Sequence, residues 1–181
     1  AASAGYVTAK HQGISPNFQT LLTFTNLPVV TGNTTLASFG SKQVFTFPAG
    51  RIRIDNVNAY FNLITFNTVA GATGDIDGGG SGDFGMGSTA TADATIATTD
   101  VDLLPSTAML DPFVTGVGRS NVWATLAAAA IFDGTTTPLS LYLNVIIDDA
   151  DVSDGAANDN VYFTGYTKIT WTLYGDNTTE A

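Results

Sequence analysis

Histidine, cysteine and aspartate are the residue types through which this chain could do acid–base, nucleophilic or metal chemistry. His11 is the only histidine among the 181 residues, and there is no cysteine. A hydrolytic triad or dyad needs a base within hydrogen-bond reach of a Ser or Cys nucleophile, and no such pattern surrounds His11. The sequence therefore predicts no catalytic residues, and we expect the protein not to be an enzyme.

Clustered carboxylates are the second candidate for chemistry, because oxygen ligands bind Ca²⁺. The segment from Asp75 to Phe84, DIDGGGSGDF, lacks the glutamate and the oxygen spacing of an EF-hand loop. A denser group of aspartates follows later in the chain, at Asp148, Asp149, Asp151, Asp154 and Asp159. This group is a weak calcium candidate, and a solvated acidic loop is the favoured interpretation, so we expect no metal and no cofactor.

Two further classes of enzyme site are not supported by the residues that surround their candidate groups. A glycosidase needs two carboxylates across a sugar-sized cleft, and no aspartate stands in an apolar, pocket-like stretch. The glycine-rich segment neither follows a buried strand with a GK[ST] motif nor opens a helix, so phosphate-loop and dinucleotide fingerprints are absent. Binding and assembly remain as the functions to consider.

Basic residues are rare, because the chain has six Lys and Arg against sixteen acidic residues and a net charge of −10. Arg51 and Arg53 are two residues apart in a predicted strand, so they share one face of it. They either contact another subunit or guard the exposed face of an edge strand against unwanted pairing. The residues that we select as interface candidates are His11, Phe18, Arg51, Arg53 and Arg119.

Aromatic residues in the predicted strands allow a second kind of binding. They could form a platform on which a sugar stacks, although aromatic residues in strands usually serve core and interface burial. The residues concerned are Tyr60, Trp123, Tyr142, Tyr162, Tyr166 and Trp171.

The charge balance narrows the class of partner. Affinity for nucleic acid comes mainly from Lys and Arg, so an acidic chain argues against a nucleic-acid partner. No apolar run approaches the roughly 20 residues of a membrane helix, so we expect no membrane partner. Charged residues make up only 12% of the chain, about half the usual share. Either other subunits cover part of the surface, or the surface is rich in uncharged Thr, Asn and Ser.

The elements that must position these residues read as β-strands, because apolar residues alternate with polar ones at period two. The stretch from Lys42 to Phe66 predicts two strands joined as a hairpin by the turn Pro48-Ala49-Gly50. The alternation changes phase at Asp55-Asn56, which predicts a β-bulge there.

Three further strands are predicted in the second half of the chain. Val122 to Phe132 is ambiguous between helix and strand because of its four alanines, and we interpret it as the hairpin partner of the strand that starts at Leu139. Val161 to Tyr174 carries the clearest strand pattern. Short strand candidates are Val101 to Leu104 and Met109 to Val114.

Two long segments have little regular pattern. Residues 1–40 are expected to form an extended N-terminal arm or an edge strand, with only the stretch QTLLTF typical of a strand. This arm either reaches a neighbouring subunit or stays within its own domain. Thr68 to Thr99 is rich in Gly, Ala, Thr and Asp and is expected to be a long surface loop with one short strand around Asp83 to Gly87.

These elements predict an all-β fold. Several strands separated by Gly, Pro and Asp turns are typical of a β-sandwich, and a jelly roll is the version that we expect. The domain division that follows is an arm or edge strand at 1–40 and a β-sandwich domain at 41–181.

The order of five segments resembles that of the decoration, or cement, proteins of tailed bacteriophages. The segments are FPAGRIRIDNVNAYFNL, GDFGMGSTATADATI, DVDLLPST, FDGTTTPLSLYLNV and YTKITWTLYGD. The resemblance spans roughly Lys42 to Asp176 and lies in order and texture rather than in one diagnostic motif. Residues 1–40 are not matched in detail.

The resemblance implies a structural virion protein on the outer surface of a phage capsid. Such a protein binds the major capsid protein and stabilises its lattice, and it forms trimers or dimers at local symmetry axes. The alternative that we retain is a carbohydrate- or receptor-binding module of a phage tail or fibre. The main coat subunit of a small virus is disfavoured, because an acidic chain has no evident genome-facing arm.

Overall fold

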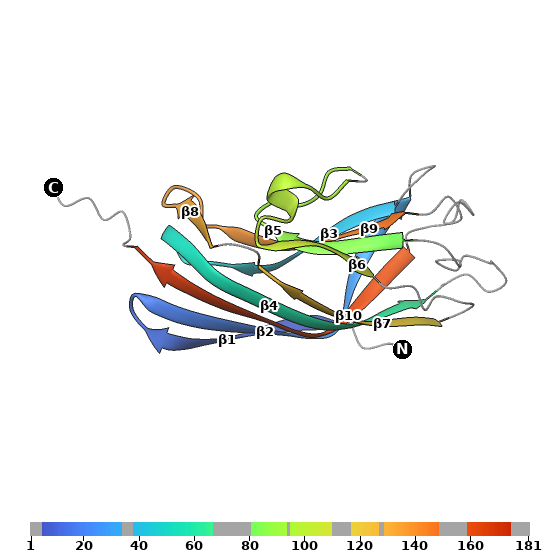
Figure 1. Cartoon of the computed structure of the whole chain (residues 1–181), viewed down its shortest axis with the longest axis horizontal. Helices are drawn as coiled ribbons and strands as arrows, with labels where there is room; N and C mark the ends of the chain where they lie inside the picture. Colours follow the sequence, from blue (N-terminus) through green and yellow to red (C-terminus); the bar gives the residue numbers. More distant parts are fainter. Residues whose placement is uncertain are drawn as a thin grey trace.

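The computed structural model describes residues 5–33, 38–66, 81–93, 95–109, 117–126, 129–148 and 159–174, and most of them lie in β-strands. The described strands form two antiparallel sheets that pack face to face (Figure 1). A buried apolar core fills the space between the sheets. The all-β sandwich predicted from the sequence is confirmed.

Sheet 1 contains the longer strands. Its order is β1 (Tyr6–Ile14), β2 (Asn17–Asn33), β10 (Asp159–Leu173), β4 (Gly50–Phe66) and β7 (Val117–Thr125), and β8 (Ala130–Gly134) also pairs with β4. Sheet 2 has the order β3 (Ser38–Thr46), β9 (Ser140–Asp148), β5 (Ser81–Gly87) and β6 (Leu104–Met109). The end of β2 pairs with the start of β3 and joins the two sheets at one edge.

The chain crosses repeatedly between the sheets. It runs from β2 in sheet 1 to β3 in sheet 2, returns to β4, crosses to β5 and β6, returns to β7, and ends with β9 in sheet 2 and β10 in sheet 1. Two four-stranded sheets wound in this way form a jelly roll. The expected jelly-roll-like architecture is therefore present, with β1 and β8 as additions to sheet 1.

Neither of the two predicted hairpins is present. β3 pairs with β2 and β9, whereas β4 pairs with β10, β7 and β8, so Pro48-Ala49-Gly50 carries the chain from one sheet to the other. β8 and β9 are likewise in different sheets. Period-two alternation shows that a strand has a buried face, but two strands that face each other across a core have the same pattern as two that are hydrogen-bonded.

The predicted bulge in β4 is confirmed. Thr170 of β10 is opposite Asn56, and Trp171 is opposite Ile54, so Asp55 is the extra residue. Ile52 and Ile54 are buried before the bulge, and the buried positions after it have the opposite parity. One inserted residue thus keeps apolar side chains on the core side along the whole strand.

The N-terminal segment forms two strands where the sequence indicated one. The stretch QTLLTF lies within β2, which pairs with β10 over most of its length and with β1 on its other side. The residues that β2 buries in the core are Leu22, Phe24, Leu27 and Val29. β2 is therefore an interior strand of the sandwich and not an edge strand, and β1, which the sequence pattern did not predict as a strand, lies at the edge instead.

Aromatic rings organise the core between the sheets. Phe61 of β4 makes edge-to-face contacts with Phe24, Phe84 and Phe163, at ring-centroid distances of 5.1 to 5.5 Å. Edge-to-face pairs at this separation are favourable beyond the area that they bury. Because β2, β5 and β10 each contribute one of these partners, the cluster ties both sheets together.

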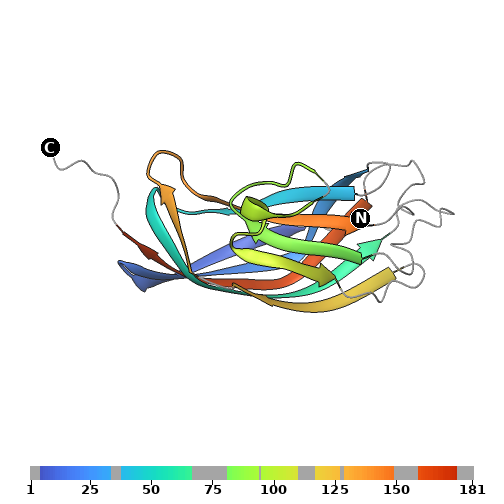
Figure 2. The same cartoon turned by 45° about the horizontal axis from the view of Figure 1, so that its top comes forward.

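The loop from Ser88 to Leu103, which includes the short 3₁₀ helix η1 (Thr98–Asp100), lies over the outer face of sheet 2 (Figures 1 and 2). It rests on the buried side chain of Asn144 in β9. Gly87 of β5 lies directly below the loop, where a Cβ would collide with the carbonyl oxygen of Thr99. Sheet 2 thus carries a cover made from its own chain.

Two smaller strand predictions met different outcomes. The short strand around Asp83 to Gly87 is present as β5. The candidate Val101 to Leu104 is wrong, because β6 begins only at Leu104 and runs through Pro105-Ser106. The candidate Met109 to Val114 lies outside the described residues except for Met109. β6 is the last strand on its side of sheet 2 among the described strands, and a proline can occupy such a position because it donates no ladder hydrogen bond.

Candidate interaction face

The outer face of sheet 1 is built from rows of side chains that cross five strands. Directly opposed residues of antiparallel strands share a face. One row, formed by register partners, is Lys10, Leu21, Lys168, Asn58 and Thr125. The next row is Thr8, Thr23, Tyr166 and Tyr60. We call these nine residues the outer face.

An open groove of about 660 Å³ lies on this face. Two tyrosines line it, Tyr60 and Tyr166, whose ring centroids are 6.2 Å apart. Leu21, with 36% of its surface exposed, and Thr23 form the other wall. The groove therefore combines aromatic and aliphatic surface with hydroxyl groups and has no carboxylate in its lining.

Gly165 shapes this groove from the strand β10. It adopts a φ of 149°, and a Cβ at this position would collide with the backbone carbonyl of Tyr60. The register with β2 shifts beside it, where Asn26 has a φ of 47°. Asn26 donates its N–H to Thr164 Oγ1 at 3.1 Å, which fixes the irregular section next to Tyr166.

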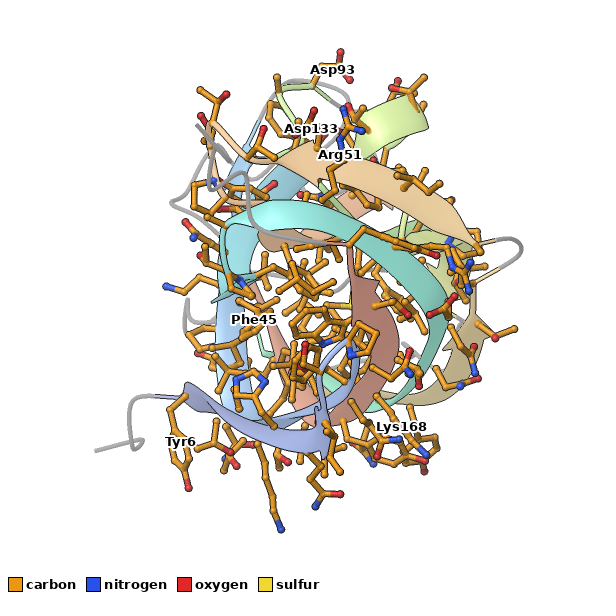
Figure 3. The ribbon with its side chains drawn as sticks, turned by 90° about the vertical axis from the view of Figure 1, so that its left-hand side faces the viewer. Tyr6, Phe45, Arg51, Asp93, Asp133 and Lys168 are labelled. Atoms are coloured by element: carbon orange, nitrogen blue, oxygen red, sulfur yellow. The ribbon has the colours of Figure 1, made fainter. Side chains whose placement is uncertain are left out.

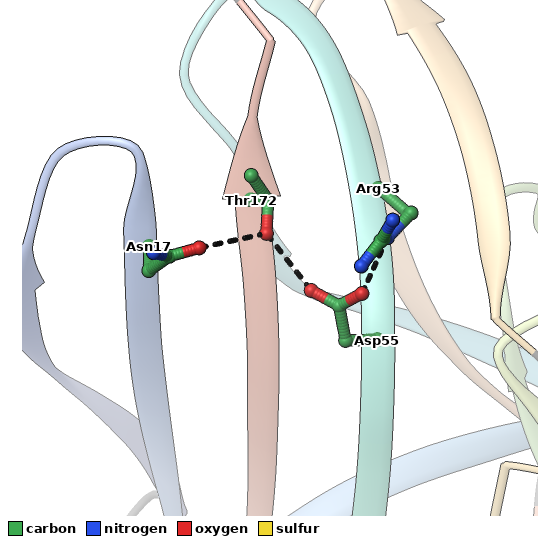
Figure 4. Close-up of polar contacts among 4 residues, drawn as sticks. All are labelled: Asn17, Arg53, Asp55 and Thr172. Atoms are coloured by element: carbon green, nitrogen blue, oxygen red, sulfur yellow. Dashed lines mark hydrogen bonds and ion pairs between the residues drawn. The ribbon is translucent and has the colours of Figure 1, made fainter.

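A network of polar contacts lies at one end of sheet 1 (Figure 4). The bulged Asp55 accepts a hydrogen bond from Arg53 and another from Thr172, whose hydroxyl oxygen is 2.9 Å from the carboxylate. Asn17 of β2 lies 3.2 Å from the same hydroxyl. The hydrogen bond and charge of Asp55 raise the pKa of Arg53 above its ordinary value. The network joins β2, β10 and β4 at the point where the bulge interrupts their ladder.

Arg51 is engaged at the end of β4. Its Nε is 3.6 Å from Asp133 of β8, and both side chains are more than half exposed. Hydrogen bonds from Thr135 to Asp133, with a smaller contribution from Arg51, lower the pKa of that carboxyl below its usual value. An exposed ion pair of this kind contributes little to stability.

The edge-strand interpretation of Arg51 and Arg53 is wrong, because β4 has a hydrogen-bonded neighbour on each side. Both arginines instead contact carboxylates of their own chain. Arg53 also lies 5.8 Å from the ring centre of Tyr174. Whether another subunit contacts them stays a prediction. Arg119 is in β7 opposite Ile64, and its side chain lies outside the described residues.

His11 and Phe18 lie at the β1–β2 edge of sheet 1. The Nδ1 atom of His11 is 3.0 Å from Thr20 Oγ1, and its ring centre is 5.3 Å from that of Phe45 in sheet 2. Phe18 stacks on Trp171 at 4.6 Å. These contacts serve packing within the chain.

Of the aspartates in the calcium candidate, Asp148 ends β9 and Asp159 begins β10, while the side chains of both and the intervening aspartates lie outside the described residues.

The six aromatic residues do not form one platform. Tyr60 and Tyr166 lie together on the outer face, whereas Trp171 is buried and donates its Nε1–H to Thr20 at 2.9 Å. Tyr142 lies in sheet 2. Sequence reasoning named both tyrosines of the outer face but could not pair them, because the register of β4 and β10 joins residues more than 100 positions apart.

Charge is divided unequally over the fold. β1, β2, β10, β4 and β7 contain five of the six basic residues and two of the sixteen acidic ones, so these strands carry +3, while the other described residues contain Lys42 and six aspartates and carry −5. Lys168 lies on the opposite side of the molecule from Asp93 and Asp133 (Figure 3). Among the described residues, Lys168 thus lies on one side of the sandwich, and Asp93 and Asp133 lie on the other side with Arg51 beside them (Figure 3).

Metal-ligating side chains do not gather at one place in the described residues. These residues contain no group of three or more His, Cys, Asp or Glu side chains placed to hold a metal ion. In the same part of the chain, no helix is long and apolar enough to cross a membrane. The described residues present a groove and an outer face that has two lysines and no carboxylate.

Comparison with known proteins gives one structural likeness. No family model matches the chain, and no curated protein does. Among solved structures, the chain is similar to an arabinose-bound MgGH51 α-L-arabinofuranosidase, with 16% sequence identity and a TM-score of 0.38. The match covers 93% of this chain and 23% of that one, so this chain spans less than a quarter of that protein's length. A likeness at this level carries no argument about activity.

Proposed function

We propose that this protein is a structural component of a phage virion that binds the outer surface of the head and stabilises the lattice of the major capsid protein. Its partners in this role are the major capsid protein and further copies of itself. The protein acts through surface complementarity and needs no cofactor.

The contrast between the two outer faces of the sandwich carries the proposal. Sheet 2 is covered by the loop from Ser88 to Leu103, while Leu21, Thr23 and Lys168 of sheet 1 remain exposed. Protein interfaces are depleted of charge at their centres and enriched in tyrosine. The outer face contains two tyrosines and no carboxylate in a chain with a net charge of −10, which supports a role in assembly.

Rebinding to heads tests this proposal. Heads that lack the protein are incubated with the purified chain, sedimented and then challenged by heat or osmotic shock. We expect the chain to sediment with the heads at saturable occupancy and to raise the temperature at which they release DNA. Heads that take up none of the chain at micromolar concentration would contradict the proposal.

A carbohydrate- or receptor-binding role is the second candidate, and the groove beside Tyr60 and Tyr166 favours it. Tyrosine rings can stack on a sugar while their hydroxyl groups form hydrogen bonds. A glycan array probed with the wild type and with Tyr166→Ala distinguishes this candidate. A glycan bound by the wild type and lost by the variant would support it, and an array without any bound glycan would remove it.

A further inference from the structure

We propose that the outer face of sheet 1 binds a second copy of this chain, through contact with the acidic side of its neighbour. The inference deepens the proposed function, since it rests on the role of self-association there and names the surface. It starts from three features of the described residues: the cover on one sheet, the composition of the other sheet and the division of charge.

The cover on sheet 2 leaves sheet 1 as the sheet with a face available for docking. The loop over sheet 2 is fixed by hydrogen bonds from Asn144 to the carbonyl oxygens of Thr89 and Asp100, at 2.9 and 2.8 Å. No loop among the described residues covers Leu21, Thr23 or Lys168, which are exposed. A second copy could therefore reach the outer face without displacing any described element.

The outer face has the composition of a contact surface. Its nine residues include two lysines and no carboxylate, in a chain with sixteen acidic residues. Its groove of about 660 Å³ provides a hollow that a protruding segment could fill. Two acidic chains repel each other, and they can approach most closely where carboxylates are absent.

Charge complementarity selects a second copy as the occupant. Among the described residues, β1, β2, β10, β4 and β7 contain five basic and two acidic residues, whereas the other described residues contain one lysine and six aspartates, so each copy holds both halves of an electrostatic match. The exposed Asp93, in the loop over sheet 2, lies on the opposite side from Lys168 (Figure 3). A neighbour that presents this side to Lys10 and Lys168 would bring opposite charges together.

The same division of charge sets the geometry of the contact. A two-fold dimer that joins two outer faces would place the lysines of one copy near those of the other and would leave the acidic sides unused. Contact between different surfaces is head-to-tail, and such contacts close into a ring when the rotation permits. Because the two surfaces lie on opposite sides of one copy, successive copies stack nearly in line, so we expect assemblies of three or more copies in the form of an open filament or a large ring.

Sedimentation of the full chain tests the inference, with Lys168→Glu as the decisive variant and Lys42→Glu as its control. Both lysines are exposed, and both changes give the same net charge, but Lys42 lies in sheet 2. We expect the wild type to sediment as assemblies of three or more copies and K168E to weaken association about tenfold or more. K42E should retain the wild-type mass.

Near-UV circular dichroism checks that each variant is folded. If K168E is unfolded, Thr23→Glu replaces it, because Thr23 lies on the next row of the outer face. The inference would be overturned by a wild type that is monomeric at about 100 μM or that forms a two-fold dimer. It would also be overturned if K168E and K42E had equal effects on association. Head binding is measured separately. Assemblies that do not bind heads would refute the proposed function alone, and monomers that bind heads would refute this inference alone.

Discussion

At the scale of single residues, Asn144 holds the loop from Ser88 to Leu103 on sheet 2. Its side chain is fully buried and donates to the carbonyl oxygens of Thr89 and Asp100, while its oxygen accepts from Thr91 and Ser41. A buried polar group without a partner costs about 1–3 kcal/mol. The stability of the cover over sheet 2 therefore depends on this one amide.

Asn144→Ala should lower the free energy of unfolding by about 3 kcal/mol, since several buried backbone groups would lose their partner. Asn58→Ala is the matched control, because the side chain of Asn58 makes one exposed hydrogen bond, to Thr125. We expect that change to cost less than about 1 kcal/mol. Urea unfolding followed by fluorescence measures both, and similar losses in the two variants would contradict the role of Asn144.

Asp102 makes the stability of the loop depend on pH. Its carboxylate accepts hydrogen bonds from the N–H and hydroxyl group of Ser88, at 2.9 and 2.7 Å. Burial nevertheless raises the pKa of Asp102 above its ordinary value of 3.8. The folded chain thus takes up this proton at a higher pH than the unfolded chain does, so the group adds stability as the pH falls through its folded pKa.

Asp102→Asn removes this titration and leaves the other carboxylates in place. The difference in Tm between wild type and D102N should shift in favour of the wild type as the pH is lowered from 7 towards 4. Thermal unfolding at a series of pH values measures this difference. A difference that is constant with pH, or that shifts towards D102N, would show that the environment of Asp102 does not raise its pKa.

At the scale of elements, β1 and β2 differ in what they contribute. Nearly all residues of β1 are exposed, whereas β2 buries four large apolar side chains. Loss of one such side chain costs about 2–5 kcal/mol, and the whole stability of a domain is about 5–15 kcal/mol. The sandwich can therefore lose β1 but not β2.

Truncation tests this difference. We expect a chain that lacks residues 1–14 to unfold cooperatively at a Tm lowered by several degrees, and a chain that lacks residues 1–33 to show no cooperative transition. Near-UV circular dichroism with thermal unfolding provides the measurement. A cooperative transition in the shorter chain would contradict the place of β2 in the core.

The sequence predicted elements well where the signal is local. Glycine and proline turns and period-two alternation predicted the all-β fold, and the change of phase at Asp55 predicted the bulge that the register confirms. The partners of strands could not be predicted, because β3 and β4 are separated by a three-residue turn yet belong to different sheets. Which strands pair is decided by long-range contacts that leave no local pattern.

The arrangement of the outer face could not be predicted from the sequence for the same reason, because it depends on long-range strand pairing. Tyr60, Tyr166 and Arg53 could be selected from the sequence as binding residues. The row that joins Tyr60 with Tyr166, and the carboxylate that binds Arg53, depend on register and on the bulge. The Asn144 contacts also escaped prediction, since a polar residue within an apolar strand does not reveal that a loop will fold over it.

At the scale of the whole molecule, the jelly roll separates two surfaces of different character. Among the described residues, one side carries the loop with Asp93 and Asp100, and the other carries the outer face with two lysines and no carboxylate (Figure 3). A head protein needs both a surface for its neighbours and a surface for solvent. This separation is what the proposed function requires of the fold.

Gold labelling of intact virions with an antibody against this chain, viewed by negative stain, is the most direct measurement of the central proposal. The account predicts gold distributed over the outer surface of the head, and no gold on heads from which the chain has been removed. Gold confined to the tail or the fibre tips would contradict the proposal and support the receptor-binding alternative. Virions that carry no gold at all would contradict both.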